Sequence, residues 1–100
     1  MEVVIASTKD VPPGKMKGIR AKGKVMLLAN LNGEYFAIGN VCTHEGCTVS
    51  DGTLQGEKVQ CPCHGSTFDV RTGAVLKGPA EKPEPLFKLR VEGDQILLVL

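Results

Sequence analysis

Two short stretches, Cys42-Thr-His-Glu-Gly-Cys47 and Cys61-Pro-Cys-His-Gly-Ser-Thr-Phe-Asp69, contain all four cysteines and both histidines of the chain. Each stretch holds a Cys close to a His, as Cys42-x-His44 and as Cys61-x-x-His64. Sixteen residues separate His44 from Cys61. Thiolates and imidazoles are common metal ligands in proteins, so this pattern favours a metal centre assembled from two loops.

The residue types alone leave other kinds of site open. Zinc fingers pair Cys with Cys and His with His at short spacing, whereas each stretch here pairs Cys with His. A zinc site of four cysteines fits less well, because one residue separates Cys61 from Cys63. A disulfide framework would need an export signal. A Cys42–His44 nucleophile and base would lack a third orienting group, and covalent haem needs C-x-x-C-H.

The rest of the chain predicts an all-β protein without a long helix. Short aliphatic or β-branched runs alternate with turn signals, of which Asn32-Gly33 is the strongest because both residues tolerate positive φ. Two prolines within Asp10–Gly14 interrupt the ladder. We expect strands over residues 2–6, 16–20, 24–30, 34–38, 87–91 and 95–100.

Length and composition limit the class of protein. One hundred residues are one domain's worth of chain, and 42% hydrophobic with 23% charged residues is ordinary for a globular protein. No apolar run is long enough to span a membrane, and no signal peptide is recognisable, so we expect a soluble, cytoplasmic protein. A net charge of +1 predicts no nucleic-acid partner, and we expect a monomer. The basic cluster over residues 15–24 either steers an acidic partner or is a solvated strand face.

Glycine, cysteine and histidine concentrate in the middle of the chain, and three prolines follow over residues 79–85. We therefore expect one domain over residues 1–100. Residues 1–41 and 78–100 would form a β base, and residues 42–77 a loop-built subdomain that carries the site.

The two motifs and their spacing resemble those of the Rieske [2Fe–2S] proteins, in which two His replace two Cys on one iron. The resemblance extends over most of the chain, through KDVPPGK (9–15), LNGEYFAIGNVCTHEGC (31–47), DVRTG (69–73) and GPAEKP (78–83). It implies the all-β Rieske fold, an antiparallel β-sandwich base with an inserted cluster-binding subdomain. It also implies one Rieske-type [2Fe–2S] cluster as cofactor.

The resemblance also implies roles for the metal ligands. Cys42 and Cys61 would bind the inner iron, and His44 and His64 the outer iron near solvent. Neutral imidazoles in place of thiolates make the cluster less negative and raise its potential. Cys47 and Cys63 match positions that carry a disulfide in Rieske proteins of the cytochrome bc and bf complexes. The alternative for this last pair is two reduced, buried cysteines.

Four further residues are expected around the cluster. Ser66 matches a serine whose hydroxyl donates to a bridging sulfide in the respiratory proteins, which raises the potential. Phe68 stands where those proteins have a tyrosine, so one hydrogen bond is lost; core packing is its simpler role. Gly65 more simply serves a tight turn. Pro79 belongs to the loop expected to cover the cluster.

The function implied is that of a one-electron carrier rather than an enzyme. Its expected partners are a reductase upstream and a terminal oxygenase or respiratory component downstream. A catalytic Rieske oxygenase is excluded, because a mononuclear iron would need two more His than the chain has. The alternatives are the Rieske domain of a quinol-oxidising complex, the small subunit of a nitrite reductase, and a zinc module.

Overall fold

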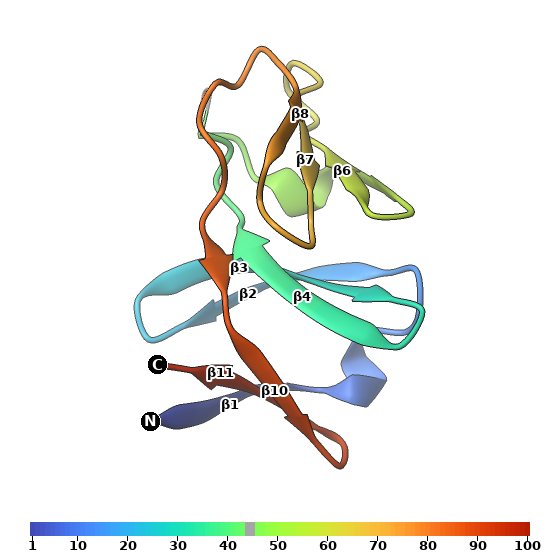
Figure 1. Ribbon diagram of the computed structural model, residues 1–100, viewed down its shortest axis with the longest axis vertical. Coiled ribbons are helices and arrows are strands. Elements are labelled where there is room, and N and C mark those ends of the chain that lie inside the picture. Colours follow the sequence, from blue (N-terminus) through green and yellow to red (C-terminus); the bar gives the residue numbers. More distant parts are fainter. Residues whose placement is uncertain (44–45) are drawn as a thin grey trace.

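The computed structural model describes residues 1–43 and 46–100, which form three antiparallel sheets arranged as successive layers (Figure 1). Their strands are β1 (Glu2–Ser7), β2 (Met16–Ala21), β3 (Lys24–Leu31), β4 (Glu34–Gly39), β5 (Thr53–Gln55), β6 (Lys58–Gln60), β7 (Thr67–Asp69), β8 (Val75–Lys77), β9 (Leu86–Phe87), β10 (Leu89–Glu92) and β11 (Gln95–Val99). Two 3₁₀ turns, η1 (Thr8–Asp10) and η2 (Val49–Asp51), are the helical segments of the described residues. None of the described helices is long and apolar enough to cross a membrane. The predicted all-β class is confirmed.

The middle sheet, in the order β2-β3-β4-β9, is covered on both faces. Met26 and Leu28 of β3 enter the core below the sheet, and Leu27 and Ala29 enter the core above it. Burial on both sides explains why β3 reads as a continuous apolar run rather than an alternating one. The β3–β4 hairpin turns at Asn32-Gly33 as predicted, with Leu31 paired to Glu34.

The lower sheet, in the order β1-β11-β10, joins the two ends of the chain. The core between it and the middle sheet consists of Val11, Met26, Leu28, Ala37, Ile96 and Leu98. The expected single strand over residues 87–91 is in fact two strands. β9 pairs with β4, and β10 pairs with β11, because the chain passes from the middle to the lower sheet at Lys88.

The upper region carries the site and is more regular than the expected set of loops. Four three-residue strands form a sheet in the order β5-β6-β7-β8, above the middle sheet in Figure 1. Each of these strands has only three residues, which is too short for a hydrophobic period to be visible in the sequence. The core between the two sheets is formed by Leu27, Ala29, Ile38, Cys42, Val49, Val59, Cys61, Phe68, Val70 and Ala80.

One segment, residues 78–85, returns the chain from β8 to β9 without regular structure (Figure 1). It runs past the cysteine-bearing loops rather than directly to the middle sheet. Its backbone is tied to the β7–β8 turn, where the Glu84 N–H donates to the Gly73 carbonyl at 2.8 Å. This segment therefore forms a third wall beside the two loops.

Candidate metal centre

Two loops at the top of the molecule have the same backbone hydrogen bonds. In the first, residues 42–47, the Cys42 N–H donates to the Cys47 carbonyl at 2.7 Å and the Gly46 N–H to the Cys42 carbonyl at 2.8 Å. In the second, residues 61–66, the Cys61 N–H donates to the Ser66 carbonyl at 2.8 Å, and the Gly65 N–H to the Cys61 carbonyl at 3.2 Å. Each loop thus starts at a predicted cysteine ligand and closes on itself.

The glycine at the fifth position of each loop allows the backbone to adopt this closed conformation. Gly46 and Gly65 have φ of 77° and 78°, in the left-handed region that side chains with a Cβ avoid. The predicted role of Gly65 in a tight turn therefore agrees with its backbone conformation.

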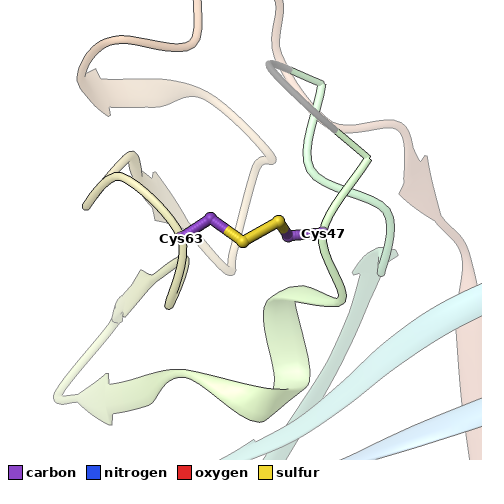
Figure 2. Close-up of a disulfide and its surroundings, with 2 residues drawn as sticks. All are labelled: Cys47 and Cys63. Carbon is purple, nitrogen blue, oxygen red and sulfur yellow. A yellow bond between two sulfur atoms is a disulfide. The ribbon is translucent and has the colours of Figure 1, made fainter.

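A disulfide between Cys47 and Cys63 joins the two loops (Figure 2). Their Cα atoms lie 6.4 Å apart, within the ordinary range for a disulfide. The predicted pairing is confirmed, and Cys42 and Cys61 are left as free, buried thiols. The sulfurs of Cys47, Cys61 and Cys63 lie within 4.8 Å of one another, but two of the three are bonded to each other. Cys61 is therefore the member of that group able to bind a metal.

The two free thiols are neighbours in the same core, although they come from different loops. Burial raises the pKa of the Cys61 thiol, and the neighbouring Cys42 thiol raises it further. The N–H groups of Cys63 and His64 donate to the Cys61 side chain and lower its pKa. Such donors stabilise a thiolate once a metal has displaced the proton.

The two predicted histidine ligands differ in what the structure describes. His64 is exposed and follows Cys63 directly in the second loop. His44 lies outside the described residues, so its position relative to the thiols is not part of this structure. An exposed imidazole next to buried thiols matches a site with an inner and an outer end.

Residues 78–85 contact both loops. The N–H of Ala80 donates to Ser66 Oγ at 3.0 Å, in a buried position next to Pro79. Because Oγ is the acceptor in this bond, the Ser66 hydroxyl hydrogen remains available for donation, as its predicted role requires. Pro79 is exposed, follows a cis peptide bond, and lines a cavity of about 320 Å³ together with Thr43, Glu81 and Lys82.

Phe68 is fully buried and belongs to the same core as Cys42 and Cys61. In β7 it pairs with Val59 of β6 and Val75 of β8, so its ring packs among aliphatic side chains. Its environment fits the packing role that the sequence offered.

Glu84 is a residue of this region that sequence reasoning missed. Its side chain is 4% exposed, and its Oε2 accepts a hydrogen bond from the Thr43 N–H at 3.2 Å. Burial raises the pKa of Glu84 to about 7, and the Thr43 N–H opposes that increase. A glutamate within a proline-rich segment gives no sequence signal of burial.

The residues present fit an iron–sulfur cluster better than a zinc ion. Two free thiols lie buried in one core, N–H donors point at the Cys61 sulfur, and a disulfide holds the two loops together. The family model described as Rieske [2Fe-2S] domain matches residues 1–95. The chain belongs to this Rieske family. The prediction made from the two motifs is thereby confirmed.

Known members support the same assignment over nearly the whole chain. This Rieske domain is 36% identical, over 93% of its length, to the ferredoxin component of naphthalene 1,2-dioxygenase/salicylate 5-hydroxylase systems from a Ralstonia species, and spans 89% of that relative. The ferredoxin of carbazole 1,9a-dioxygenase from Nocardioides aromaticivorans superposes with a TM-score of 0.93 at 28% identity, over 98% of this chain and 96% of that one.

A third match concerns a ferredoxin together with its partner. It comes from the complex of reduced oxygenase and oxidised ferredoxin in carbazole 1,9a-dioxygenase, with a TM-score of 0.90, 26% identity and coverage of 97% and 91%. These relatives are electron carriers rather than catalysts. The chain is accordingly an electron-transfer protein with a Rieske-type [2Fe–2S] cluster, as predicted.

Proposed function

We propose that Cys42 and Cys61 bind the inner iron of the cluster as thiolates and that His44 and His64 bind the outer iron. The proposal for the inner end rests on two free thiols, Cys42 and Cys61, that lie buried side by side in one core. Exposure of His64 and its place beside the cysteines support the outer end. When bound, the cluster supplies reversible one-electron chemistry.

The chain's own residues would isolate and orient that centre. The disulfide keeps the two loops together, and the buried core around Cys42 and Cys61 excludes water from the thiolates. The Ser66 hydroxyl is free to donate to a sulfur. Such a bond stabilises the reduced form of the centre and raises its potential.

We further propose that this protein works in the cytoplasm as the ferredoxin component of an oxygenase system. It would accept one electron from a reductase and pass it to a terminal oxygenase. The observation that carries this step is full-length similarity to ferredoxin components of dioxygenase systems. A related ferredoxin in complex with its oxygenase supports transfer by direct docking.

The ligand assignment is tested by metal analysis of purified variants. The native protein is expected to hold two irons and two acid-labile sulfides per chain. Cys42→Ser, Cys61→Ser, His44→Ser and His64→Ser should each lose the cluster or change its visible and electron paramagnetic resonance spectra. A native-like spectrum in any of these four variants would remove that residue from the ligand set.

The partner assignment is tested by reconstitution. A flavin-dependent reductase with NADH and an aromatic-ring oxygenase are mixed with and without this protein, and product is measured. Product formation that requires the native protein, and that fails with Cys61→Ser, supports the proposal. Reduction of the protein without any transfer to the oxygenases tested would contradict the assignment to these systems.

A second candidate, the Rieske domain of a quinol-oxidising complex, is favoured by the Cys47–Cys63 disulfide and by Ser66. Rieske potentials span about −150 to +300 mV. An acceptor of electrons from quinol needs a potential in the upper part of that range. Voltammetry that places the protein there would favour this second candidate over the ferredoxin role.

A further inference from the structure

Backbone hydrogen bonds hold Glu84 in place, and its side chain fits into the space beside Gly39. Its N–H donates to the Gly73 carbonyl at 2.8 Å, and the next carbonyl, that of Pro85, accepts from the Gly39 N–H at 2.9 Å. A Cβ at Gly39 would lie only 2.5 Å from Glu84 Oε1. The carboxylate therefore occupies space that a side chain at position 39 would fill.

The other carboxylate oxygen holds the first loop at its second residue. Glu84 Oε2 accepts from the Thr43 N–H at 3.2 Å, and the Thr43 hydroxyl donates to the Lys82 carbonyl at 2.6 Å. Thr43 lies between Cys42 and His44, the two ligands proposed for this loop. The N–H and the hydroxyl of Thr43 are thus both bound by the 78–85 segment, and the bond to the N–H depends on the Glu84 side chain.

Glu84 accepts a hydrogen bond from the Thr43 N–H, and the described residues give its charge no salt-bridge partner. Lys24 lines the same groove of about 470 Å³, together with the apolar side chains of Val25, Val41 and Phe87. With a pKa of about 7, most of the Glu84 side chain is ionised at pH 8. A buried negative charge acts over a longer range than an exposed one, because solvent screens it less.

We propose that Glu84 is a positioning residue of the metal centre, which anchors the first loop through Thr43 and, as a buried anion, lowers the potential of the bound cluster. The proposal rests on the ligand assignment above. A negative charge near the centre opposes the addition of an electron, so its removal should raise the potential.

Two variants separate anchoring from charge. Glu84→Gln keeps a carbonyl oxygen for the Thr43 N–H but removes the charge. Glu84→Leu removes both and leaves a partly buried N–H without its acceptor. Glu81→Gln is the matched control, because Glu81 is an exposed glutamate of the same segment and the substitution changes the net charge equally.

Two measurements on the cluster-loaded protein read the two effects. The first is the potential by voltammetry at pH 8, where Glu84→Gln should raise it at least three times as much as Glu81→Gln does. The second is hydrogen exchange of the peptide covering residues 41–47, followed by mass spectrometry. Glu84→Leu should accelerate exchange there at least tenfold and shorten the cluster's lifetime, whereas Glu84→Gln should retain native protection.

Other results would overturn the proposal. Equal potential shifts in Glu84→Gln and Glu81→Gln would show that the buried charge does not act on the centre. Native protection of residues 41–47 in Glu84→Leu would show that the carboxylate does not anchor the loop. If Glu84→Leu does not fold, Glu84→Ala replaces it, and native protection of residues 41–47 in that variant would equally contradict anchoring by the carboxylate. Failure of the ligand assignment is recognised separately, by native-like spectra in the Cys or His variants.

Discussion

The two cysteine-bearing loops share one backbone frame but are supported by different chemistry. Residues 42–47 and 61–66 have the same pair of internal hydrogen bonds and a glycine of the same φ at the fifth position. The 78–85 segment holds the first loop through a buried carboxylate on the Thr43 N–H. It holds the second through a neutral hydroxyl, Ser66 Oγ, which accepts from the Ala80 N–H.

Both supports hold a loop in place, but they influence the metal centre in different ways. Each support provides one hydrogen bond, partly buried at Thr43 and buried at Ala80, but only the carboxylate adds a charge that depends on pH. The hydroxyl, in contrast, keeps a hydrogen that can be donated to sulfur. Two loops with the same backbone conformation can therefore affect the metal centre differently, through a charge beside the first loop and through a hydrogen-bond donor in the second.

The largest expected effect comes from breaking the bond that couples the loops. Cys47→Ser or Cys63→Ser opens a disulfide with a sequence separation of 16 residues. Closing a loop of about this length stabilises a protein by about 3 kcal/mol. Each single variant should therefore lose about that much stability in denaturant unfolding and release its cluster faster. The double variant should lose no more than either single one, and a doubled loss would contradict the pairing.

The next largest expected effect is a pH dependence of stability, which arises from Glu84, the residue that supports the first loop. The pKa of Glu84 is raised by burial from 4.5 to about 7, so between these values the folded protein binds a proton that the unfolded chain has released. Stability should therefore fall as pH rises from about 4.5 to 7, and level off above.

The size of this effect is about 2 kcal/mol, since one pKa unit corresponds to about 1.4 kcal/mol and part of the burial penalty relaxes. The measurement is thermal unfolding of the native protein and of Glu84→Gln across this pH range. Their difference should change with pH. A constant difference would show that Glu84 titrates as an exposed carboxyl.

The support of the second loop predicts a smaller loss of stability together with a change of potential. Ser66→Ala leaves the buried Ala80 N–H without an acceptor, which costs about 1–2 kcal/mol. It also removes the hydroxyl donor and should lower the potential. Thr72→Ala is the control, because Thr72 Oγ1 accepts from the Ala74 N–H at an exposed site where water replaces it. An unchanged potential in Ser66→Ala would leave Ser66 with the structural role alone.

The smallest expected effect tests whether the backbones of the two loops are equally constrained. Gly46→Ala and Gly65→Ala each force a Cβ into the left-handed region, at about 1 kcal/mol. The Gly65 variant should lose slightly more, because its Cβ would lie 3.3 Å from Gln60 Nε2, against 3.9 Å from Val41 Cγ1 for Gly46. Unfolding in denaturant compares them. A several-fold difference would mean that the loops are not equally constrained.

Several features of the fold and site were predictable because they depend on residues close in sequence. The Asn32-Gly33 turn determines the register of β3 against β4, and the observed strand bounds lie within a residue or two of those expected there. The spacing of Cys and His within each loop identified the family. The pairing of Cys47 with Cys63 also followed, although from family resemblance rather than from spacing.

The sequence by itself determined the hairpins and the family, and it predicted which residues would bind the cluster, because turn conformation and ligand spacing are local properties. Only the tertiary structure decided that β3 is buried on both faces, that the chain changes sheets at Lys88 and that Glu84 is enclosed. The enclosure of Glu84 depends on Gly39 and on Thr43, which is 41 residues away along the chain. Burial of a charged side chain results from packing between distant segments, and no local pattern records it.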